Sequence, residues 1–336
     1  MIRLILIAFA FASMSLMSAQ GQSREVYTIH GIAVDERAPT VGEAQQKAFA
    51  YAKRVGAQRL IERFTLPEDR AAATDLIIDQ ALADRIAAAV DVEEEIAGAG
   101  RYRGSLAVVY NPSQLRLALT QVGLPFTDSL GPRAVLFTTT SNGMDFAWKL
   151  AWDETPKESL VPLLVSDTSG YRPDTDWQIL QDEFSLYGAQ RGMFANLRGG
   201  QGGYLVDLVS VTASGSRTIG TTRRASTLEG AKTAVVELLN EEWKRTSIVR
   251  DTSRTLIEAT VRYTSLAEWN TLRGALVRSP LVSNFQTRAI STDGAFIAFA
   301  FAGNGQRLTS DLRDRGVVIN AEEIGWVMTS AISGGQ

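Results

Sequence analysis

Few side chains in this sequence are suited to catalysis or to metal binding. His30 is the only histidine, and there is no cysteine. A zinc site or a Ser-His-Asp triad would therefore have to be built around this one imidazole, which lies inside a β-rich run at residues 26–34. The lack of cysteine excludes disulfides, thiolate ligands and a lipid-attachment cysteine. We predict no catalytic residue, no metal site and no cofactor, and we interpret His30 as a strand residue with satisfied hydrogen bonds.

The carboxylates give only a weak indication of chemistry. Glu93, Glu94 and Glu95 form the one compact acidic run. In a strand, Glu93 and Glu95 share one face and Glu94 points to the other, which is typical of a solvated edge. Glycoside hydrolysis needs two carboxyl groups at a defined separation, which a sequence does not show. The residues that could supply such a pair are Asp153, Glu154, Asp174, Asp176, Asp182 and Glu183. We therefore predict that the chain is not an enzyme.

Two tryptophans are candidates for an interaction surface. Phe146, Trp148, Leu150 and Trp152 alternate with Ala147, Lys149 and Ala151, and this period of two predicts a strand. Trp148 and Trp152 could form a stacking platform for a glycan or a peptide, or they could be the buried face of a hairpin. We favour the core interpretation.

A second candidate surface is basic and lies near the C-terminus. Arg307 and Arg313, with Arg273, Arg278 and Arg315, fall on two expected helices. Such a surface could meet an acidic partner, whereas the alternative is an ordinary solvated helix face.

The elements that must position these residues fall into three groups. Residues 24–127 predict a β-α-α-β-β-α unit. Thr40 and Glu43 have capping-box spacing at the start of its first helix, and Thr65 and Glu68 have it at the start of a second helix that buries Ile78, Leu82, Ile86 and Val90. Strands at 92–96 and 102–110 follow, and then a helix that Asn111 caps with Pro112 in its first turn.

Residues 133–250 predict a middle α/β domain. Strands are expected at 134–140 and at 160–165, where Pro162 restricts the strand to an edge or a bulge. A helix at 176–187, three strands and a helix at 228–246 follow. The glycine-rich link at 199–203 joins two strands and lacks the lysine of a phosphate loop, so it predicts a hairpin turn.

Residues 253–331 predict a ferredoxin-like domain, because their elements follow the order β-α-β-β-α-β. Two right-handed crossovers flank the turn at Asp293-Gly294. The expected core is Leu256, Val261, Leu272, Leu276, Phe285, Phe299, Leu308 and Leu312. The strand at 295–302 is apolar on both sides, so we expect it to be central or to meet another domain on one face. The fold class is therefore α+β, with tandem small α/β sandwich domains.

The N-terminus has the layout of a signal peptide. Arg3 precedes an uncharged apolar run at residues 4–17, and cleavage is expected after Ala19 or Gly21, so that residues 1–21 are removed. The run is shorter than the roughly 20 apolar residues that a membrane-spanning helix needs. We predict a periplasmic protein with no stable membrane span after cleavage. Retention of the segment as an anchor is the alternative.

Composition agrees with a globular chain of two or three domains. The 336 residues are 45% hydrophobic and 21% charged, with a formal net charge of −3. This charge is too small to attract nucleic acid, and no basic stripe interleaved with aromatic residues is present. Nucleic acid is therefore not an expected partner.

Several short motifs resemble a known family. They are the opening strand and helix at residues 26–64, the Thr65-Leu66-Pro67 junction, the Arg101-Tyr102 strand that ends in Asn111-Pro112, the Trp152-Asp153 turn and the helix at 266–276 with Trp269. Over nearly the whole mature chain they resemble the exported bacterial family catalogued as domain of unknown function 2066. This sequence has a shorter and less proline-rich segment after Trp152. The N-terminal unit also resembles the first domain of a periplasmic flagellar assembly protein.

The resemblance implies an exported protein and supplies no catalytic residue. Taken together, the sequence predicts a non-catalytic interaction or assembly module of the cell envelope whose partner is an envelope protein that the sequence does not identify. The alternative is a glycan-binding or glycan-hydrolysing protein that uses residues 148–183.

Overall fold

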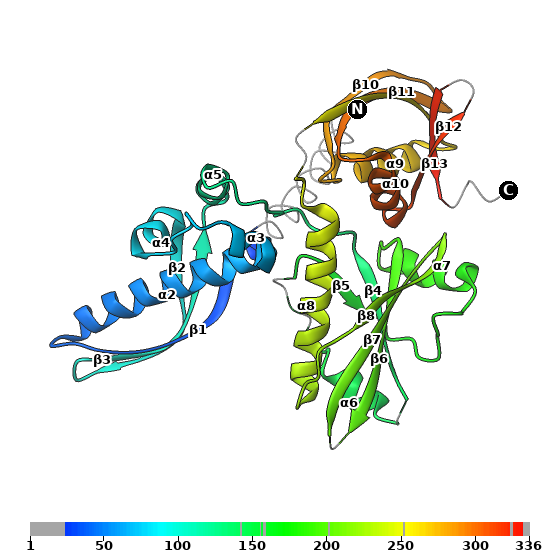
Figure 1. Cartoon of the computed structure of the whole chain (residues 1–336). Coiled ribbons are helices and arrows are strands. Elements are labelled where there is room, and N and C mark those ends of the chain that lie inside the picture. The colour runs from blue at the N-terminus through cyan, green and yellow to red at the C-terminus, as the bar shows by residue number, and fades with distance from the viewer. Residues whose placement is uncertain are drawn as a thin grey trace, which may run out of the picture. The chain divides into compact units, whose positions relative to one another are not determined.

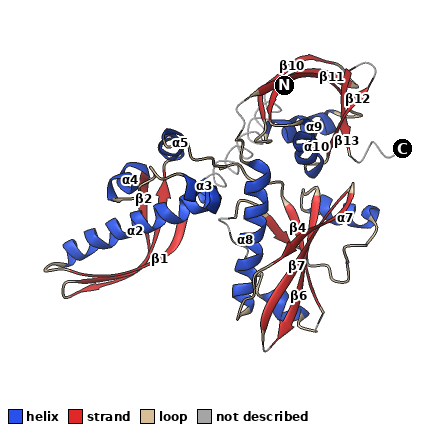
Figure 2. Ribbon diagram, viewed as in Figure 1, coloured by secondary structure: helices blue, strands red, loops and turns tan. Residues whose placement is uncertain are grey.

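The computed structural model describes residues 24–141, 143–154, 156, 159–200, 202–250, 253–322 and 325–331. The predicted signal peptide, residues 1–21, lies outside these residues. The chain divides into two compact units, Met1–Asp128 and Ser129–Gln336. The described residues form three sheets, each accompanied by helices, so the predicted α+β class is confirmed (Figures 1 and 2). The division of the second unit into residues 133–250 and 253–331 stays a prediction.

In the first unit, one long helix covers one face of a three-stranded antiparallel sheet. The sheet has the order β1-β3-β2, with β1 at Thr28–Arg37, β2 at Ala87–Gly98 and β3 at Arg101–Tyr110. Helix α2, Val41–Phe64, begins at Thr40, whose hydroxyl accepts a hydrogen bond from the Glu43 N–H at 3.2 Å. Its buried side is rich in alanine, which lets the helix lie close to the strands. Helix α5, Pro112–Gln121, closes the unit and is capped by Asn111 as predicted.

The predicted second helix of this unit is wrong in its extent. The structure has two short helices, α3 at Pro67–Ala72 and α4 at Gln80–Ile86, and β2 begins immediately afterwards. The Thr65 hydroxyl donates to the Ile61 carbonyl at 2.5 Å, so it ends α2 and does not cap α3. Val90 pairs with Val108 in the sheet. Pairing with β3 therefore outweighs the helical spacing of the apolar residues.

The first sheet of the second unit, which we call the middle sheet, mixes parallel and antiparallel strands. Its order is β5-β4-β6-β7-β8, and β4 is parallel to both β5 and β6. The strand bounds are Ala134–Thr140 for β4, Leu163–Val165 for β5, Arg191–Gly200 for β6, Gly203–Thr212 for β7 and Gly215–Thr221 for β8. Strand β5 lies at the edge, as Pro162 predicts. The helices are α6, Asp145–Leu150, α7, Trp177–Leu186, and α8, Leu228–Ser247.

The predicted strand at Phe146–Trp152 is wrong, because this segment forms α6 and the turn that follows it. Alternating positions in a short run also contain pairs four residues apart, and such pairs share one face of a helix. Trp148 and Trp152 are such a pair and are both buried, whereas Phe146 and Leu150 are 82% and 54% exposed. The alternating apolar residues therefore lie on two sides of a helical turn, with one pair buried and the other pair exposed.

The C-terminal sheet follows the predicted element order and then adds a strand. Its elements are β9, Arg254–Arg262, α9, Leu266–Val277, β10, Val282–Ile290, β11, Gly294–Ala302, α10, Gly305–Asp314, β12, Val317–Glu322, and β13, Gly325–Ser330. The order is β10-β11-β9-β13-β12. The additional strand β13 pairs in parallel with β9 and places β12 at the edge. Strand β11 is central, as its two apolar faces predict.

Leu256 is not part of the C-terminal core, contrary to the prediction. Successive strand residues point to opposite faces, and Ile257, Ala259 and Val261 of β9 face the helices. Leu256 has the other parity and is 68% exposed. Phe285 is partly buried against the core, and the other predicted members are buried.

Candidate functional site

The structure buries both candidate tryptophans. Trp148 and Trp152 are 0% and 1% exposed and pack edge to face, with ring centroids 5.5 Å apart. The Trp148 indole N–H donates to the Ala195 carbonyl at 3.0 Å. These side chains form the core, and neither is available as an exposed stacking platform.

The predicted basic surface of the C-terminal helices is only partly present. Arg313 is exposed. Arg307 donates to the carbonyls of Thr246 and Ile248 at 2.7 and 2.6 Å, so it holds the segment that follows α8. Arg315 is buried against Asp311, with 3.1 Å between Nε and Oδ2, and it does not belong to a surface.

His30 lies between two carboxylates. A β-bulge in strand β2 places the side chains of the acidic run 93–95 on faces other than those predicted. Its ring nitrogens lie 2.8 Å from Glu93 and 3.1 Å from Glu25. The pairing of β2 with β3 shifts between Val92 and Glu94. Glu93 consequently accepts from Ser105 on one face of β3, whereas Glu95 accepts from Tyr102 on the other. The prediction that Glu93 and Glu95 share a face is wrong, because the bulge interrupts the alternation.

The strand order of the middle sheet changes direction at β4. The chain passes from β4 through α6 to β5 on one side of β4, and then through α7 to β6 on the other side. Because β-α-β crossovers are right-handed, these two connections place α6 and α7 on opposite faces of the sheet, and Figure 1 shows this arrangement. Ligands of open α/β sheets bind beyond the carboxyl ends of the strands at such a switch point.

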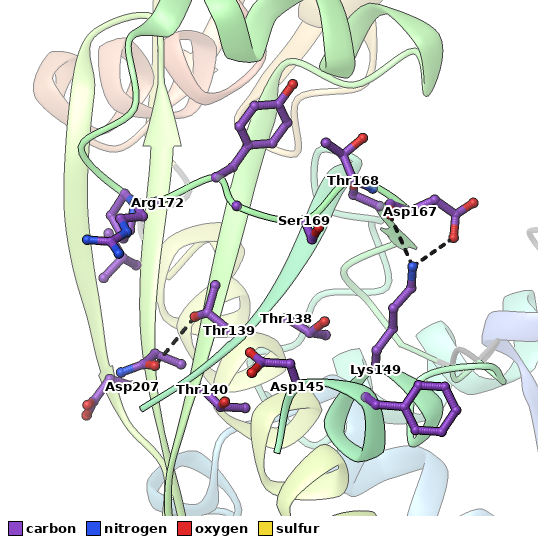
Figure 3. A pocket seen from close by; sticks show the side chains of 17 residues that line it. Thr138, Thr139, Thr140, Asp145, Lys149, Asp167, Thr168, Ser169, Arg172 and Asp207 are labelled. Atoms are coloured by element: carbon purple, nitrogen blue, oxygen red, sulfur yellow. Dashed lines mark hydrogen bonds and ion pairs between the residues drawn. The ribbon is translucent and has the colours of Figure 1, made fainter. Parts of the chain in front are cut away.

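A cleft of about 930 Å³ lies at this point. It is bounded by the end of β4, by α6 and by the loop after β5. The side chains drawn in Figure 3 include Thr138, Thr139, Thr140, Asp145, Phe146, Lys149, Asp167, Thr168, Ser169, Tyr171, Arg172, Asn196 and Asp207. We call it the β4–β5 cleft.

The loop after β5 is fixed by a buried carboxylate. Glu183 of α7 is 8% exposed and accepts from the Ser166 hydroxyl at 2.5 Å and from the Thr168 hydroxyl at 3.1 Å. The Thr168 N–H donates to the Ser166 hydroxyl at 3.0 Å. A buried carboxylate with several charge-assisted hydrogen bonds holds its partners firmly. The fold therefore shapes residues 166–170 before any ligand arrives.

Several charged groups of the cleft are already paired. Lys149 lies 3.1 Å from the Asp167 carboxylate, and Figure 3 shows this pair on one wall. Asp207 accepts from Arg198 and from Thr221 at 2.7 and 2.6 Å. Burial of Asp207 opposes its ionisation, but these hydrogen bonds and the charge of Arg198 outweigh burial and lower the pKa of Asp207.

Other polar groups of the cleft are not used by the fold. Within the described part of the chain, the side chains of Thr138, Asp145, Ser169 and Arg172 make no hydrogen bond or ion pair. The Thr140 hydroxyl oxygen is buried and has no partner among those residues. A buried hydroxyl without a partner costs about 1–3 kcal/mol. The cleft thus offers hydroxyl groups, one carboxylate and one guanidinium to a ligand.

The region 148–183, predicted from the sequence for the glycan alternative, contains Lys149 and the loop after β5 but not the end of β4, Asp145 or Phe146. A usable signal was present, namely three threonines at the end of the strand at 134–140 and the polar run Ser166-Asp167-Thr168-Ser169-Gly170 directly after the next strand. The carboxyl ends of adjacent parallel strands meet at one edge of a sheet. The prediction of a strand at 146–152 concealed the β-α-β connection that makes β4 and β5 parallel.

The described residues thus define an α+β protein with three sheets and a polar cleft at the switch point of the middle sheet. No protein-family model matches the chain, and no curated protein matches it in sequence. Part of the chain is similar to the crystal structure of TolB from Acinetobacter baumannii, with a TM-score of 0.22 and 9% identity over 39% of this chain and 32% of that chain. This chain therefore spans about a third of the length of that TolB chain. The resemblance to the uncharacterised exported family stays a prediction.

Within the residues that the structure describes, no helix combines the length and the apolar composition needed to cross a membrane.

Proposed function

We propose that this protein is an exported, non-catalytic binding module of the bacterial cell envelope and that it takes its ligand or partner in the β4–β5 cleft. The observation that carries the proposal is the contrast between the rigid walls of the cleft and its unused polar groups. Glu183 fixes the loop after β5, whereas the side chains of Thr138, Asp145, Ser169 and Arg172 make no hydrogen bond or ion pair within the described chain. Preorganised polar groups of this kind lower the cost of binding.

The charged residues of the cleft support binding more than proton transfer. General acid catalysis near neutral pH requires a carboxyl group whose pKa is raised towards 7. The pKa of Asp207 is shifted in the opposite direction, so this carboxyl stays ionised. The Lys149 ammonium lies 3.1 Å from the Asp167 carboxylate, so it is already engaged in an ion pair.

The export half of the proposal rests on the sequence. Arg3 and the apolar run at residues 4–17 have the composition of a signal peptide. We expect the secreted chain to begin at Gln20 or Gln22, and the intact mass of protein purified from the periplasmic fraction measures this directly. Membrane-bound protein that retains residues 1–19 would contradict it.

The alternative function is glycan binding or hydrolysis through residues 148–183. A glycan cannot stack on Trp148 or Trp152, because both side chains are buried. A glycan would contact the β4–β5 cleft instead, where Phe146 and Tyr171 supply the aromatic surface.

Hydrogen–deuterium exchange tests the cleft as the binding site. We expect a soluble extract of the cell envelope to slow exchange in residues 138–150 and 166–172 of the purified chain. Glu183→Ala frees the loop after β5, so it should abolish this protection. Asp182→Ala is the matched control, since Asp182 is the exposed neighbour on the same helix, and it should leave the protection unchanged. Protection that survives Glu183→Ala, or that lies elsewhere, would show that the cleft is not the site.

A further inference from the structure

The unused groups of the β4–β5 cleft select for a particular ligand chemistry. Thr138, Asp145 and Ser169 lie around its centre in Figure 3. A carboxylate only accepts hydrogen bonds, whereas a hydroxyl both donates and accepts. Neighbouring hydroxyl groups of a sugar ring can donate to both oxygens of Asp145 and still accept from Thr138 and Ser169. A polyhydroxylated ligand would therefore satisfy all three side chains.

The aromatic residues of the cleft suit the apolar face of a sugar ring. Phe146 lines the cleft and is 82% exposed, which is unusual for so large an apolar side chain. The Tyr171 ring packs edge to face against Phe137 with centroids 5.5 Å apart, so its position is fixed by the core. Stacking against an aromatic ring buries apolar surface without requiring new polar partners.

The Arg172 side chain favours a ligand that carries a negatively charged group. The other cation that lines the cleft, Lys149, already pairs with Asp167. The guanidinium of Arg172 has no partner in the described residues and can bind a carboxylate through two parallel hydrogen bonds. A cleft of about 930 Å³ is large enough for more than one sugar ring.

Taking the proposed function as its basis, we infer that the β4–β5 cleft binds an acidic saccharide, with a sugar ring at Thr138, Asp145 and Ser169 and a carboxylate substituent at Arg172.

Other anionic or charged ligands fit the cleft less well. Phosphate sites of α/β proteins use a glycine-rich turn that leads directly into a helix. Here α6 has six residues, and the loop after β5 continues to Trp177 before α7 begins. A free amino acid carries its ammonium and carboxylate on one carbon atom, whereas Asp145 and Arg172 belong to different walls of the cleft in Figure 3.

Calorimetric titration of the purified chain, residues 24–336, tests this inference. The probes are a disaccharide of glucuronate and N-acetylglucosamine, the matching disaccharide with glucose in place of glucuronate, and free glutamate. We expect the acidic disaccharide to bind about tenfold more tightly than the neutral one, because only its carboxylate can pair with the Arg172 guanidinium. Glutamate should not bind.

Two variants separate the two parts of the inference. Arg172→Gln should reduce the affinity for the acidic disaccharide to that for the neutral one and leave the neutral one unchanged. Asp145→Asn should weaken both about tenfold. Arg133→Gln is the control, because Arg133 is exposed at the opposite end of β4, and it should change neither affinity.

Three results would overturn the inference. Equal binding of the two disaccharides, unaffected by Arg172→Gln, contradicts the carboxylate site. Binding of glutamate in their place assigns the cleft to amino acids. Absence of saccharide binding while the envelope extract still protects the cleft from exchange refutes the saccharide and leaves the proposed function standing, whereas absence of both refutes the proposed function as well.

Discussion

At the scale of single residues, helix α2 packs closely against strand β3 in the first unit. Gly56 lies in the middle of α2, and a Cβ atom built on it would overlap the Tyr110 hydroxyl. That hydroxyl cannot move aside easily, since the Tyr110 ring is buried and the hydroxyl donates to the Lys53 carbonyl at 2.7 Å. Two effects therefore compete when Gly56 is replaced.

We expect Gly56→Ala to destabilise the first unit. Alanine gains about 1 kcal/mol of helix propensity over glycine, but overpacking a rigid core costs about 1–3 kcal/mol, so the net change should be a loss of up to about 2 kcal/mol. Urea unfolding followed by far-ultraviolet circular dichroism measures it. Gly42→Ala is the control, because Gly42 is in the same helix and has open space around its Cα. A Gly56→Ala chain as stable as Gly42→Ala would refute the packing argument.

Asp207 predicts a pH dependence of stability. Its pKa in the folded chain lies below the ordinary value of 3.8, so the unfolded state binds protons more readily. The stability that ionised Asp207 contributes is then fully present above about pH 5 and is lost as the pH falls through its lowered pKa. We expect Asp207→Asn to lower the urea midpoint at pH 7 and to lower it less at pH 2.5, where the unfolded-state carboxyl is protonated. An equal loss at both pH values would mean that ionisation of Asp207 is not the cause.

At the scale of elements, α6 forms one wall of the cleft and depends on its tryptophan. Trp148 fills the space between α6 and the middle sheet, and its indole N–H reaches the Ala195 carbonyl. The same helix carries Phe146 on its exposed side. Within this six-residue helix, the core residue Trp148 and the cleft residue Phe146 are therefore only two positions apart.

We expect Trp148→Ala to cost about 3–5 kcal/mol of the unfolding free energy, because it removes a fully buried aromatic side chain. Phe146→Ala, on the same helix, should change stability by less than about 0.5 kcal/mol. Tryptophan fluorescence during urea unfolding measures both, since five tryptophans remain in the Trp148 variant. Similar losses for the two variants would indicate that the segment is a strand buried on both sides.

At the scale of the whole molecule, the two compact units carry different spectroscopic probes. All six tryptophans lie between residues 148 and 326, in the unit Ser129–Gln336. The first unit contains none, but it contributes α2, the longest helix in the described chain, to the circular dichroism signal. Tryptophan fluorescence therefore follows the unfolding of the second unit alone, whereas circular dichroism follows the helices of both units.

We expect residues 24–128 and 129–336 to fold when expressed as separate fragments. Each has its own buried core and its own sheet or sheets, and units of this size fold alone. The fluorescence midpoint of fragment 129–336 should match that of the whole chain. A non-cooperative transition in either fragment would show that its core depends on the other unit.

Within the larger fragment, Arg307 bonds to the carbonyls of Thr246 and Ile248, so residues 253–336 alone should melt at a lower temperature than residues 129–336.

Local chemistry made much of the element pattern predictable. The caps at Thr40, Asn111 and Ser265, each a side chain that accepts from a backbone N–H of the first turn, follow from the residue types alone. The order of elements through residues 253–322 and the edge position forced by Pro162 are equally local properties.

The remaining features depended on contacts between distant residues. Val90 lies in a strand because it pairs with Val108 of β3. The bulge that puts Glu93 and Glu95 on opposite faces is defined only by the pairing of β2 with β3. Trp148 and Trp152 fit a strand or a helix equally well by spacing, and burial against the middle sheet decided for the helix. The β4–β5 cleft joins residues 138–149 to residues 166–173 and to Asn196 and Asp207. No sequence interval shows that juxtaposition, because it is created by the strand order of the sheet.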